Sequence, residues 1–298
     1  MRRTFDYIIE PQYQNVTIST YLKEAGYPHA VLVHLKKTTQ GILLNGKWEY
    51  VNTRLSTGDL LTIHLIEEES SKQIPPIYHP LNIVYEDEDI LVINKTANMP
   101  VHPSFKHYEN TLANAVCYYY ENQGIPYTFR CVNRLDKNTS GLTILAKHML
   151  SSAILSEQVA ARQVHREYLA IVQGETPLRG TIDAPIGRKD TSTIERQIDY
   201  EKGEHAVTHY TQLETKNGYT LLSLKLETGR THQIRVHMSS VGYPLIGDFL
   251  YNETSQEMDR QALHSHKLCF THPITKESLE FTAPIPADMQ DFWNSLPD

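Results

Sequence analysis

The pattern of apolar and polar residues first predicts a small unit of mixed helix and strand over residues 1–66. Residues 18–25 read as a helix. The turn Asn45-Gly46 stands between two short apolar runs, which is the strongest short-range signal for a β-hairpin. A further strand is expected at residues 60–65, so the first unit should be small and of α+β type.

A charged segment with adjacent prolines separates this unit from a larger one. Residues 67–80 contain Pro75-Pro76 and no periodic pattern, so we predict a linker before a second unit at 81–298. The strands of that unit are expected at 83–85, 90–93, 142–146, 167–172, 207–213 and 219–226, with two more around Pro273. Its helices are expected at 111–121, at 151–162 with Ser151 at the start, and at 231–241 with Gly242 as the C-cap. This order predicts an α+β fold with a mostly antiparallel sheet.

Composition places the chain among ordinary globular proteins. Of its 298 residues, 40% are hydrophobic and 21% are charged, which is enough apolar material for a real core. The sequence shows no apolar run long enough to cross a bilayer and no signal peptide at its start, so no membrane partner is expected. The three cysteines, Cys117, Cys131 and Cys269, are too few and odd in number for a disulfide framework. A reducing cytoplasm is the expected location.

The charges are distributed unevenly along the chain. The net charge of −7 argues mildly against a nucleic-acid partner. Residues 130–189, however, hold nine basic and five acidic side chains, whereas residues 251–298 hold three basic and eight acidic ones. A phosphate-binding face needs only local positive potential. Both such a face and an ordinary solvated surface fit this distribution.

Three segments carry residue types that could perform chemistry, although each alone has an ordinary structural explanation. In residues 133–142, Asp136 precedes a Thr-Ser-Gly turn that leads into an apolar strand. Such a turn can hold a carboxylate at the end of a sheet, where sites often form, but a surface Asp in a capped turn is the commoner case. In residues 166–170, Tyr168 could simply be a core aromatic. Residues 228–237 could form an amphipathic helix with solvated Arg and His.

Together and in this order, the three segments resemble the RluA-type RNA pseudouridine synthases. The central motif of that family is His-Arg-Leu-Asp, two variable residues and Thr-Ser-Gly, which matches residues 133–141. The family's tyrosine segment matches Tyr168, and its Gly-Arg-Thr-His-Gln-Ile-Arg-Val-His helix matches residues 229–237. Residues 242–248 also match, and the resemblance runs from about 81 to 284. Three separated motifs in the right order are far more specific than one short match.

The sequence departs from the family pattern in two places. Asn133 stands where the family usually has His, and an amide can donate and accept hydrogen bonds but cannot titrate. That His is not the family's catalytic residue, so we expect activity to be retained. The first unit resembles the S-four-like RNA-binding domain of many family members, but residues 17–22 lack its usual Arg-Leu-Asp. With seven basic and five acidic residues, the unit is expected to keep the fold and to bind RNA weakly.

The resemblance implies that the protein isomerises uridine to pseudouridine in ribosomal or transfer RNA. The bond from C1′ to N1 of uracil breaks, the base turns, and C5 joins C1′ without any redox change, so no cofactor is expected. The resemblance gives the catalytic roles to Asp136, Tyr168 and Arg235. Asp136 would trap or stabilise the sugar cation, as glycosidase carboxylates do, or remove a sugar proton as a base. Arg235 would keep it ionised, and Tyr168 would stack on the base or assist proton loss from C5.

The resemblance also implies which residues bind the RNA. The target base must leave the helical stack to reach the carboxylate, and phosphate contacts and stacking must offset that cost. Arg134 would lie near the flipped base, and Arg230 would meet a phosphate, since a planar guanidinium suits that role. Thr139, His232 and Gln233 complete the predicted substrate-binding set. RNA is the expected partner, and we expect the protein to be a monomer.

Two other functions are weighed against this one. An RNA-binding protein that uses the same fold without catalysis is favoured by the replaced histidine and the divergent first unit, and is opposed by the retention of all three catalytic residues. A metal hydrolase is suggested by the 15 histidines. His232 and His237 would point about 140° apart on a helix. His264 and His266 could share a strand face, but no third ligand is obvious in the sequence, so no metal is expected.

Overall fold

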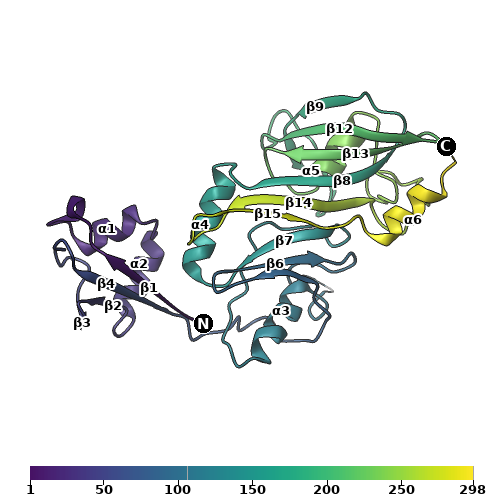
Figure 1. The fold of residues 1–298 in the computed structure, drawn as a ribbon. Helices are drawn as coiled ribbons and strands as arrows, with labels where there is room; N and C mark the ends of the chain where they lie inside the picture. The colour runs from purple at the N-terminus through teal and green to yellow at the C-terminus, as the bar shows by residue number, and fades with distance from the viewer. Residues whose placement is uncertain (106, 298) are drawn as a thin grey trace.

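The computed structural model describes residues 1–105 and 107–297, and Figure 1 shows a small N-terminal unit beside a larger one. The small unit is a four-stranded antiparallel sheet in the order β1-β4-β2-β3. Its elements are β1 (Arg2–Ile8), η1 (Pro11–Tyr13), α1 (Ile18–Glu24), α2 (His29–Lys37), β2 (Ile42–Leu44), β3 (Lys47–Trp48) and β4 (Leu60–Ile66). The predicted hairpin is confirmed, with Asn45 and Gly46 at φ of 51° and 77°, as a tight two-residue turn requires.

The sequence pattern does not predict β1 or α2, for reasons that the structure makes clear. β1 opens with two arginines and alternates polar residues with Phe5, so its apolar face is short. α2 follows Pro28, which offers no side-chain cap, and its last turn carries Lys36 and Lys37. Both elements are held by the core of the unit, where buried side chains of the helices meet the inward face of the sheet.

The larger unit is built on one nine-stranded sheet in the order β5-β6-β7-β14-β8-β13-β12-β9, with β15 paired to β14. The pairing is antiparallel except between β7 and β14, so the predicted mostly antiparallel α+β fold is confirmed. Its strands are β5 (Ile83–Glu86), β6 (Ile90–Lys95), β7 (Ser140–Ala146), β8 (His165–Gln173), β9 (Arg179–Asp183), β12 (Val207–Lys216), β13 (Tyr219–Leu226), β14 (Leu263–Thr271) and β15 (Ser278–Thr282). A separate two-stranded ribbon consists of β10 (Ile186–Arg188) and β11 (Arg196–Ile198).

Helices cover both faces of this sheet. α3 (Leu112–Glu121) and α5 (Gln233–Ser240) contribute to one core, which they share with Leu91 of β6 and Tyr168 of β8. α4 (Met149–Ala160) contributes to another, in which Leu155 meets Ile144 of β7. α6 (Ala287–Ser295) covers the far end of β8 through Trp293. Successive residues of a strand enter opposite cores, as the period of two requires.

The two units share a hydrophobic core at their junction. Leu150 and Ile154 of α4 pack among the buried residues of the N-terminal unit. The N-terminal amine of Met1 donates to the carbonyls of Glu67 (2.6 Å) and Pro126 (3.0 Å). Residues 67–80 contain no helix or strand, yet Glu67 forms a 2.5 Å ion pair with Arg130. The segment expected as a linker is therefore pinned to the larger unit.

Two predicted helix starts are wrong by two residues each. α4 begins at Met149 rather than Ser151, because the imidazole of His148 is the cap and accepts from the backbone N–H of Ser151 at 3.2 Å. α5 begins at Gln233 rather than at residue 231, because His232 adopts the left-handed conformation with φ of 57°. α5 then runs to Ser240, and Gly242 follows the helix at φ of 87°, as a C-cap glycine does.

Candidate active site

Asp136 lies in the turn that precedes β7, near the middle of the large sheet. The backbone N–H of Thr139 closes the turn on the carbonyl of Asp136 at 3.1 Å. The carbonyls of residues 137 and 138 accept hydrogen bonds from side chains outside the turn. Lys95 donates to the carbonyl of residue 137 (3.2 Å), and Arg260 donates to the carbonyl of residue 138 (3.2 Å). The carboxylate therefore stands on a backbone that is fixed from two sides.

Strand register brings Tyr168 to the same place. Gly141 on β7 pairs with Ser265 on β14, and Ser265 pairs with Tyr168 on β8. A Cβ on Gly141 would lie 2.2 Å from the carbonyl oxygen of Ser265, so the final glycine of the Thr-Ser-Gly turn is required by close backbone approach. Asp136, in the turn before β7, and Tyr168, on β8, thus reach one site although β14 lies between the two strands in the sheet.

Arg235 links the carboxylate to a second, fully buried acid. Its Nη1 donates to Oδ2 of Asp136 at 3.0 Å, while Nε and Nη2 donate to the two oxygens of Asp248 at 2.7 and 2.8 Å. Burial disfavours the charge on Arg235, but the hydrogen bonds and charge of Asp248, together with Asp136, outweigh it and raise the pKa of the guanidinium. The planar fork holds a fixed positive charge against Asp136.

Asp136 itself keeps much of its hydrogen-bonding capacity unused. Within residues 1–105 and 107–297, Arg235 is the one side chain that donates a hydrogen bond to this carboxylate. Its side chain is 25% exposed, whereas that of Asp248 is 1% exposed. An ionised carboxylate accepts through both oxygens, so Asp136 retains lone pairs toward solvent.

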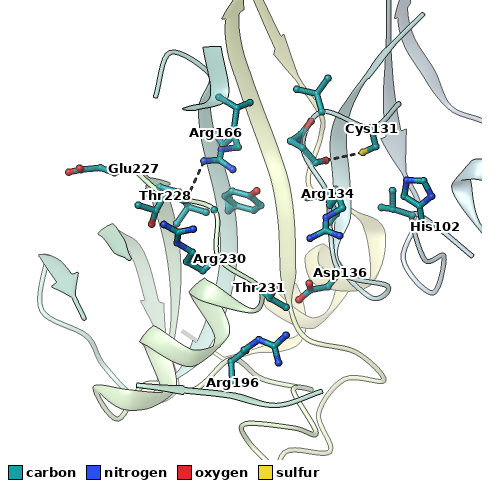
Figure 2. A pocket seen from close by; sticks show the side chains of 18 of the residues that line it. His102, Cys131, Arg134, Asp136, Arg166, Arg196, Glu227, Thr228, Arg230 and Thr231 are labelled. Carbon is teal, nitrogen blue, oxygen red and sulfur yellow. Dashed lines mark hydrogen bonds between the residues drawn. The ribbon is translucent and has the colours of Figure 1, made fainter. Parts of the chain in front are cut away.

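The open side of Asp136 faces a cleft of about 870 Å³ with basic walls. Figure 2 shows Arg134 beside Asp136 on one wall, Arg166 and Arg230 on the opposite wall, and Arg196 below. Arg162, Lys137 and His102 also line it. The locally basic middle of the chain therefore contributes to one concave surface, joined by arginines from later segments. Such a surface attracts a polyanion even though the whole chain is acidic.

The five predicted substrate-binding residues lie around Asp136 in two groups. Arg134 and Arg230 are exposed in the cleft, and Arg230 donates to the carbonyl of His205 (3.1 Å) and pairs with Glu204. His232 is partly buried, with Nε2 at 3.8 Å from Oδ2 of Asp136.

Gln233 and Thr139 are buried and bonded within the protein. The amide oxygen of Gln233 accepts from the N–H of Arg230 and the hydroxyl of Thr228, and its nitrogen donates to the carbonyl of Val207. Gln233 therefore shapes the 228–230 turn at the cleft wall. Thr139 closes the turn of Asp136, so both act on the site through the backbone.

Tyr168 is 6% exposed, at the base of the cleft. Burial raises the pKa of its phenol, and the neighbouring guanidinium of Arg166 opposes that shift. Arg166 donates to the carbonyl of Thr228 at 3.2 Å, while its Nε is buried without a partner among the described residues. Tyr168 is thus a neutral aromatic whose hydroxyl stays protonated near neutral pH.

Asn133 occupies the family's histidine position as a structural residue. Its amide oxygen accepts from the N–H of Ile144 at 2.7 Å, and its amide nitrogen donates to the carbonyl of Leu142 at 3.2 Å. Its own carbonyl accepts from Thr143 at 2.8 Å. The backbone of β7 offers one N–H and one carbonyl at this place, and the amide of Asn133 bonds to both without being a titratable group.

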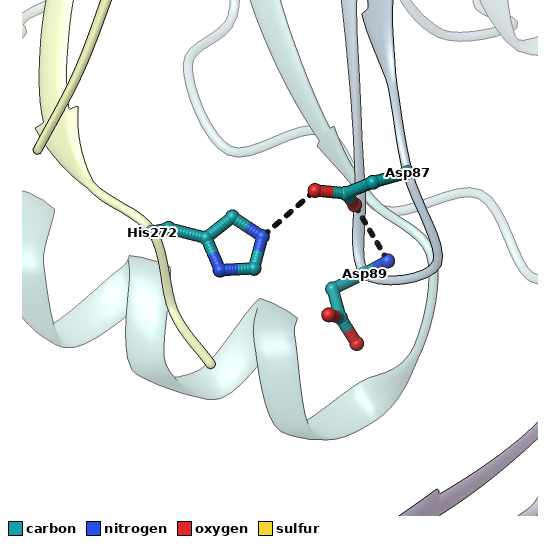
Figure 3. Close-up of side chains that lie close together, drawn as sticks. All are labelled: Asp87, Asp89 and His272. Atoms are coloured by element: carbon teal, nitrogen blue, oxygen red, sulfur yellow. Dashed lines mark hydrogen bonds and ion pairs between the residues drawn. The ribbon is translucent and has the colours of Figure 1, made fainter. Parts of the chain in front are cut away.

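Asp87, Asp89 and His272 lie close enough together to suggest a metal site (Figure 3). The Nδ1 atom of His272 accepts the backbone N–H groups of Ile274 (3.2 Å) and Thr275 (2.9 Å), so the ring proton is on Nε2. That protonated Nε2 is the nitrogen that faces Asp87, at 3.0 Å. A metal needs an unprotonated nitrogen, and Asp89 is already bound by Arg3, so this grouping offers no free ligand set.

The other histidines considered as ligands are also engaged. Both nitrogens of His237 are used, by the hydroxyl of Thr208 and the carbonyl of Ala184, each at 2.9 Å. His264 contacts Ser140 at 2.9 Å, and His266 contacts the carbonyl of Ala283 at 2.7 Å. These contacts occupy both nitrogens of His237 and one nitrogen each of His264 and His266, while Nε2 of His264 is buried without a partner among the described residues.

Sequence reasoning misses several residues that build the site. Asp248 appears only as part of a matched segment, and its pairing with Arg235 depends on a turn that no periodic pattern predicts. Lys95, 1% exposed, has its pKa lowered to about 7 by burial, against the pull of Asp136. Tyr251 touches both Arg235 and His232. The signal that could find such residues is spatial, since each acts on a segment distant in sequence.

Comparison with known proteins shows which proteins this chain is similar to. The family model described as RNA pseudouridylate synthase matches residues 89–240. Uncharacterized RNA pseudouridine synthase YjbO of Bacillus subtilis is 42% identical over 92% of this chain and 97% of its own length. Ribosomal large subunit pseudouridine synthase D of Vibrio cholerae is 41% identical over 82% of this chain and 79% of its own length.

A solved structure gives the same picture at the level of the fold. Human RNA Pseudouridylate Synthase Domain Containing 1 is 28% identical, with a TM-score of 0.58 over 73% of this chain and 86% of its own. Within the described residues, no helix combines the length and apolar character needed to cross a bilayer.

Proposed function

This chain belongs to the RNA pseudouridylate synthase family, and we propose that Asp136 is the carboxylate with which it converts uridine in RNA to pseudouridine. The enzyme is an RNA pseudouridine synthase. The observation that carries the proposal for Asp136 is its position in the arginine-lined cleft, where Arg235 holds it by one N–H at 3.0 Å and its remaining lone pairs are open.

The reaction is an isomerisation whose atoms and electrons balance within the substrate. The C1′–N1 bond breaks, uracil turns, the C5–C1′ bond forms, and the proton on C5 is lost while N1 gains one. Asp136 can attack C1′ and leave again when C5 bonds. Alternatively, it can remove a proton from C2′ so that the base departs, and return that proton to C2′ when C5 bonds to C1′. Either route needs an ionised carboxylate, which the fixed charge of Arg235 favours.

Tyr168 and the cleft arginines support the nucleotide in this proposal. The buried ring of Tyr168 would stack on uracil, and its hydroxyl would assist the loss of the C5 proton. Arg134, exposed beside Asp136, would fill the space near the extruded base. Arg230 would bind a backbone phosphate in exchange for Glu204.

We propose ribosomal RNA of the large subunit as the substrate, and transfer RNA as the alternative. The printed name of the Vibrio cholerae relative refers to the large ribosomal subunit, as does that of a 40% identical relative from Escherichia coli O6:H1. A cleft of about 870 Å³ lined by several arginines suits a structured RNA, whose phosphates supply most of the affinity.

The first unit would add a second RNA contact of modest strength. We propose residues 1–66 as a divergent S-four-like unit, 67–80 as the connecting segment and 81–298 as the catalytic domain. The protein is expected to work as a monomer in the cytoplasm, where its RNA substrates lie.

The proposal is tested by mapping pseudouridine on defined RNAs. Purified protein is incubated with large-subunit ribosomal RNA and with transfer RNA, both free of modification, and pseudouridine is located by chemical probing. The matched control is Asp136→Asn. We expect pseudouridine at a small number of ribosomal sites with the natural enzyme alone. Modification of transfer RNA alone would contradict the substrate, and equal activity of the variant would contradict the role of Asp136.

A further inference from the structure

We propose that Tyr251 is a positioning residue that fixes His232 as a neutral N–H donor to the uridine held at Asp136. This inference rests on the proposed role of Asp136 and extends it, since neither the sequence motifs nor the mechanism above uses Tyr251.

Tyr251 contacts both groups that flank Asp136. Its hydroxyl lies 2.8 Å from Nδ1 of His232 and accepts the backbone N–H of Arg196 at 2.9 Å. Its ring lies below the guanidinium of Arg235, with Cζ at 5.0 Å from the ring centroid. One side chain therefore supports the arginine by a cation–π contact and the imidazole by a hydrogen bond.

These contacts favour one placement of the protons. The hydroxyl of Tyr251 accepts from Arg196, and we assign its own proton to Nδ1 of His232, the acceptor that lies 2.8 Å away. Nδ1 therefore carries a lone pair, and the neutral ring has its proton on Nε2. The tautomer is set by a partner on the far side of the ring, as in metal and catalytic histidines.

The Nε2–H group is then directed at the reaction centre but forms no hydrogen bond with Asp136. It lies 3.8 Å from Oδ2 of Asp136, which is beyond hydrogen-bonding distance. The imidazole is 10% exposed, in the same cavity as Asp136 and Tyr168. A nucleotide whose C1′ meets Asp136 would bring its neighbouring oxygens, on the ribose or at C2 of uracil, within reach of this donor. Such a donor can stabilise the negative charge that develops on the departing base.

The backbone of His232 supports a specific role for this ring. The residue has φ of 57° and ψ of 19°, a left-handed conformation that residues other than glycine rarely adopt, although histidine is among those that adopt it more often. The turn before it is held by the amide of Gln233, which accepts from Arg230 and Thr228. Conformations of this kind persist where the surroundings enforce them, and they concentrate at functional sites.

The charges around His232 keep it neutral. Burial lowers the pKa of the imidazole; Asp136 and Asp248 oppose this, while Arg235 on α5 and Arg196 on β11 reinforce it. The hydrogen bond from Tyr251 favours the neutral ring as well, because a protonated Nδ1 could not accept it. If the ring does gain a proton, it becomes a cation beside Asp136 and competes with Arg235 for the carboxylate.

Tyr251→Phe tests the positioning role, because it keeps the ring under Arg235 and removes only the hydroxyl. The pH dependence of kcat/KM is measured on the modified ribosomal site identified for the natural enzyme. We expect a loss of a few-fold at pH 8 and of at least about tenfold at pH 6, since His232 gains a proton more easily. Profiles of the two enzymes that superimpose after scaling would overturn the positioning role.

His232→Gln and His232→Leu test the donor. Glutamine places an N–H at about the reach of Nε2 and does not titrate, whereas leucine fills similar space without a donor. We expect the Gln variant to keep activity within about tenfold and the Leu variant to lose about a hundredfold at pH 8. Equal activity of the two variants would overturn the donor role. Thermal unfolding and RNA binding confirm that each variant is folded.

The controls separate this inference from the proposed function. Loss of activity in Asp136→Asn together with full activity in His232→Leu would leave the proposed function standing and contradict only the inference. Absence of pseudouridine with the natural enzyme would instead contradict the substrate assignment.

Discussion

The chain contains two groupings of the same three residue types, and they differ in how completely the aspartate is bonded. The cleft cluster consists of Asp136, Arg235 and His232. The junction cluster consists of Asp89, Arg3 and His148, where the N-terminal unit meets the larger one. In the junction cluster Arg3 donates to both oxygens of Asp89 (2.9 and 3.3 Å), and His148 lies 2.8 Å from one of them.

The difference separates a structural carboxylate from a reactive one. Asp89 is 3% exposed, and although burial alone would raise its pKa, His148 and Arg3 lower it to about 2. Asp136 has one donor at 3.0 Å and a histidine held 0.8 Å further away, at 3.8 Å. The residue types alone therefore do not indicate whether a carboxylate is reactive. The lone pairs of the carboxylate that remain free of hydrogen bonds do indicate it.

The largest expected effect comes from neutralising the cleft carboxylate. Asp136→Asn should reduce the rate of pseudouridine formation by at least about 10³-fold, because the amide can neither attack C1′ nor remove a proton. Single-turnover assays measure the rate, and thermal unfolding and RNA binding should stay close to those of the natural enzyme. If the variant were inactive because it is unfolded, Asp136 would be a structural carboxylate like Asp89, and the two clusters would not differ in role.

The matching change in the junction cluster should affect stability instead. Asp89→Asn leaves His148 without its anion and Arg3 with only the exposed Glu88, and breaking such a buried pair lowers the free energy of unfolding by about 3 kcal/mol. Urea unfolding followed by circular dichroism measures the loss. The rate per folded molecule should stay within about twofold. A large loss of rate in fully folded Asp89→Asn would mean that the junction communicates with the cleft.

Arg235→Lys tests whether the planar fork is what keeps Asp136 in place. A single ammonium group cannot bond to Asp136 and to both oxygens of Asp248, so we expect kcat to fall about a hundredfold with a smaller change in RNA affinity. Kinetics under saturating enzyme separate the two quantities. An unchanged kcat would show that positive charge alone suffices.

The pH dependence of stability distinguishes the clusters without altering the enzyme's active site. The unfolded pKa of Asp is about 3.9, and the folded pKa of Asp89 is about 2. A lowered folded pKa stabilises the fold above the unfolded value, and this contribution is lost as pH falls from about 4 towards 2. The stability difference between the natural protein and Asp89→Asn, measured by urea unfolding at pH 6 and pH 3, should therefore shrink at pH 3. A constant difference would contradict the low pKa.

The smallest effect is expected at the residue that replaces the family's histidine. In Asn133→His a neutral imidazole can again supply one donor and one acceptor to β7, so activity should stay within about twofold near pH 8. Rates at pH 8 and pH 6 check this, because only the variant has a titratable group there. A large gain in activity would show that Asn133 limits catalysis in this chain.

The cleft cluster was more predictable from sequence than the junction cluster. The family resemblance predicts that Asp136, His232 and Arg235 share one site, because each lies in a segment that matches a family motif. Arg3 and Asp89 are 86 positions apart and lie in a charged strand and a charged turn, which read as solvated surface. Their pairing depends on how two units dock, and no local periodicity encodes that.

The finer geometry of the site was unpredictable for a related reason. Helical spacing suggests that α5 begins at residue 231, yet the left-handed backbone of His232 delays the start and directs its ring to Tyr251. Likewise, Ser151 has the residue type of an N-cap, but His148 performs that role through a side chain that also binds Asp89. In both cases a tertiary contact overrides the local preference.

The shared core at the junction has a consequence for the RNA. Because Leu150 and Ile154 of α4 complete the interior of the first unit, its surface and the cleft are held at one separation and one angle. An RNA that touches both must present its target uridine and a second contact at that same spacing, or else bend to do so. If the first unit binds RNA as proposed, the enzyme selects an RNA by its folded dimensions, and a uridine in the right sequence but the wrong architecture would not be modified.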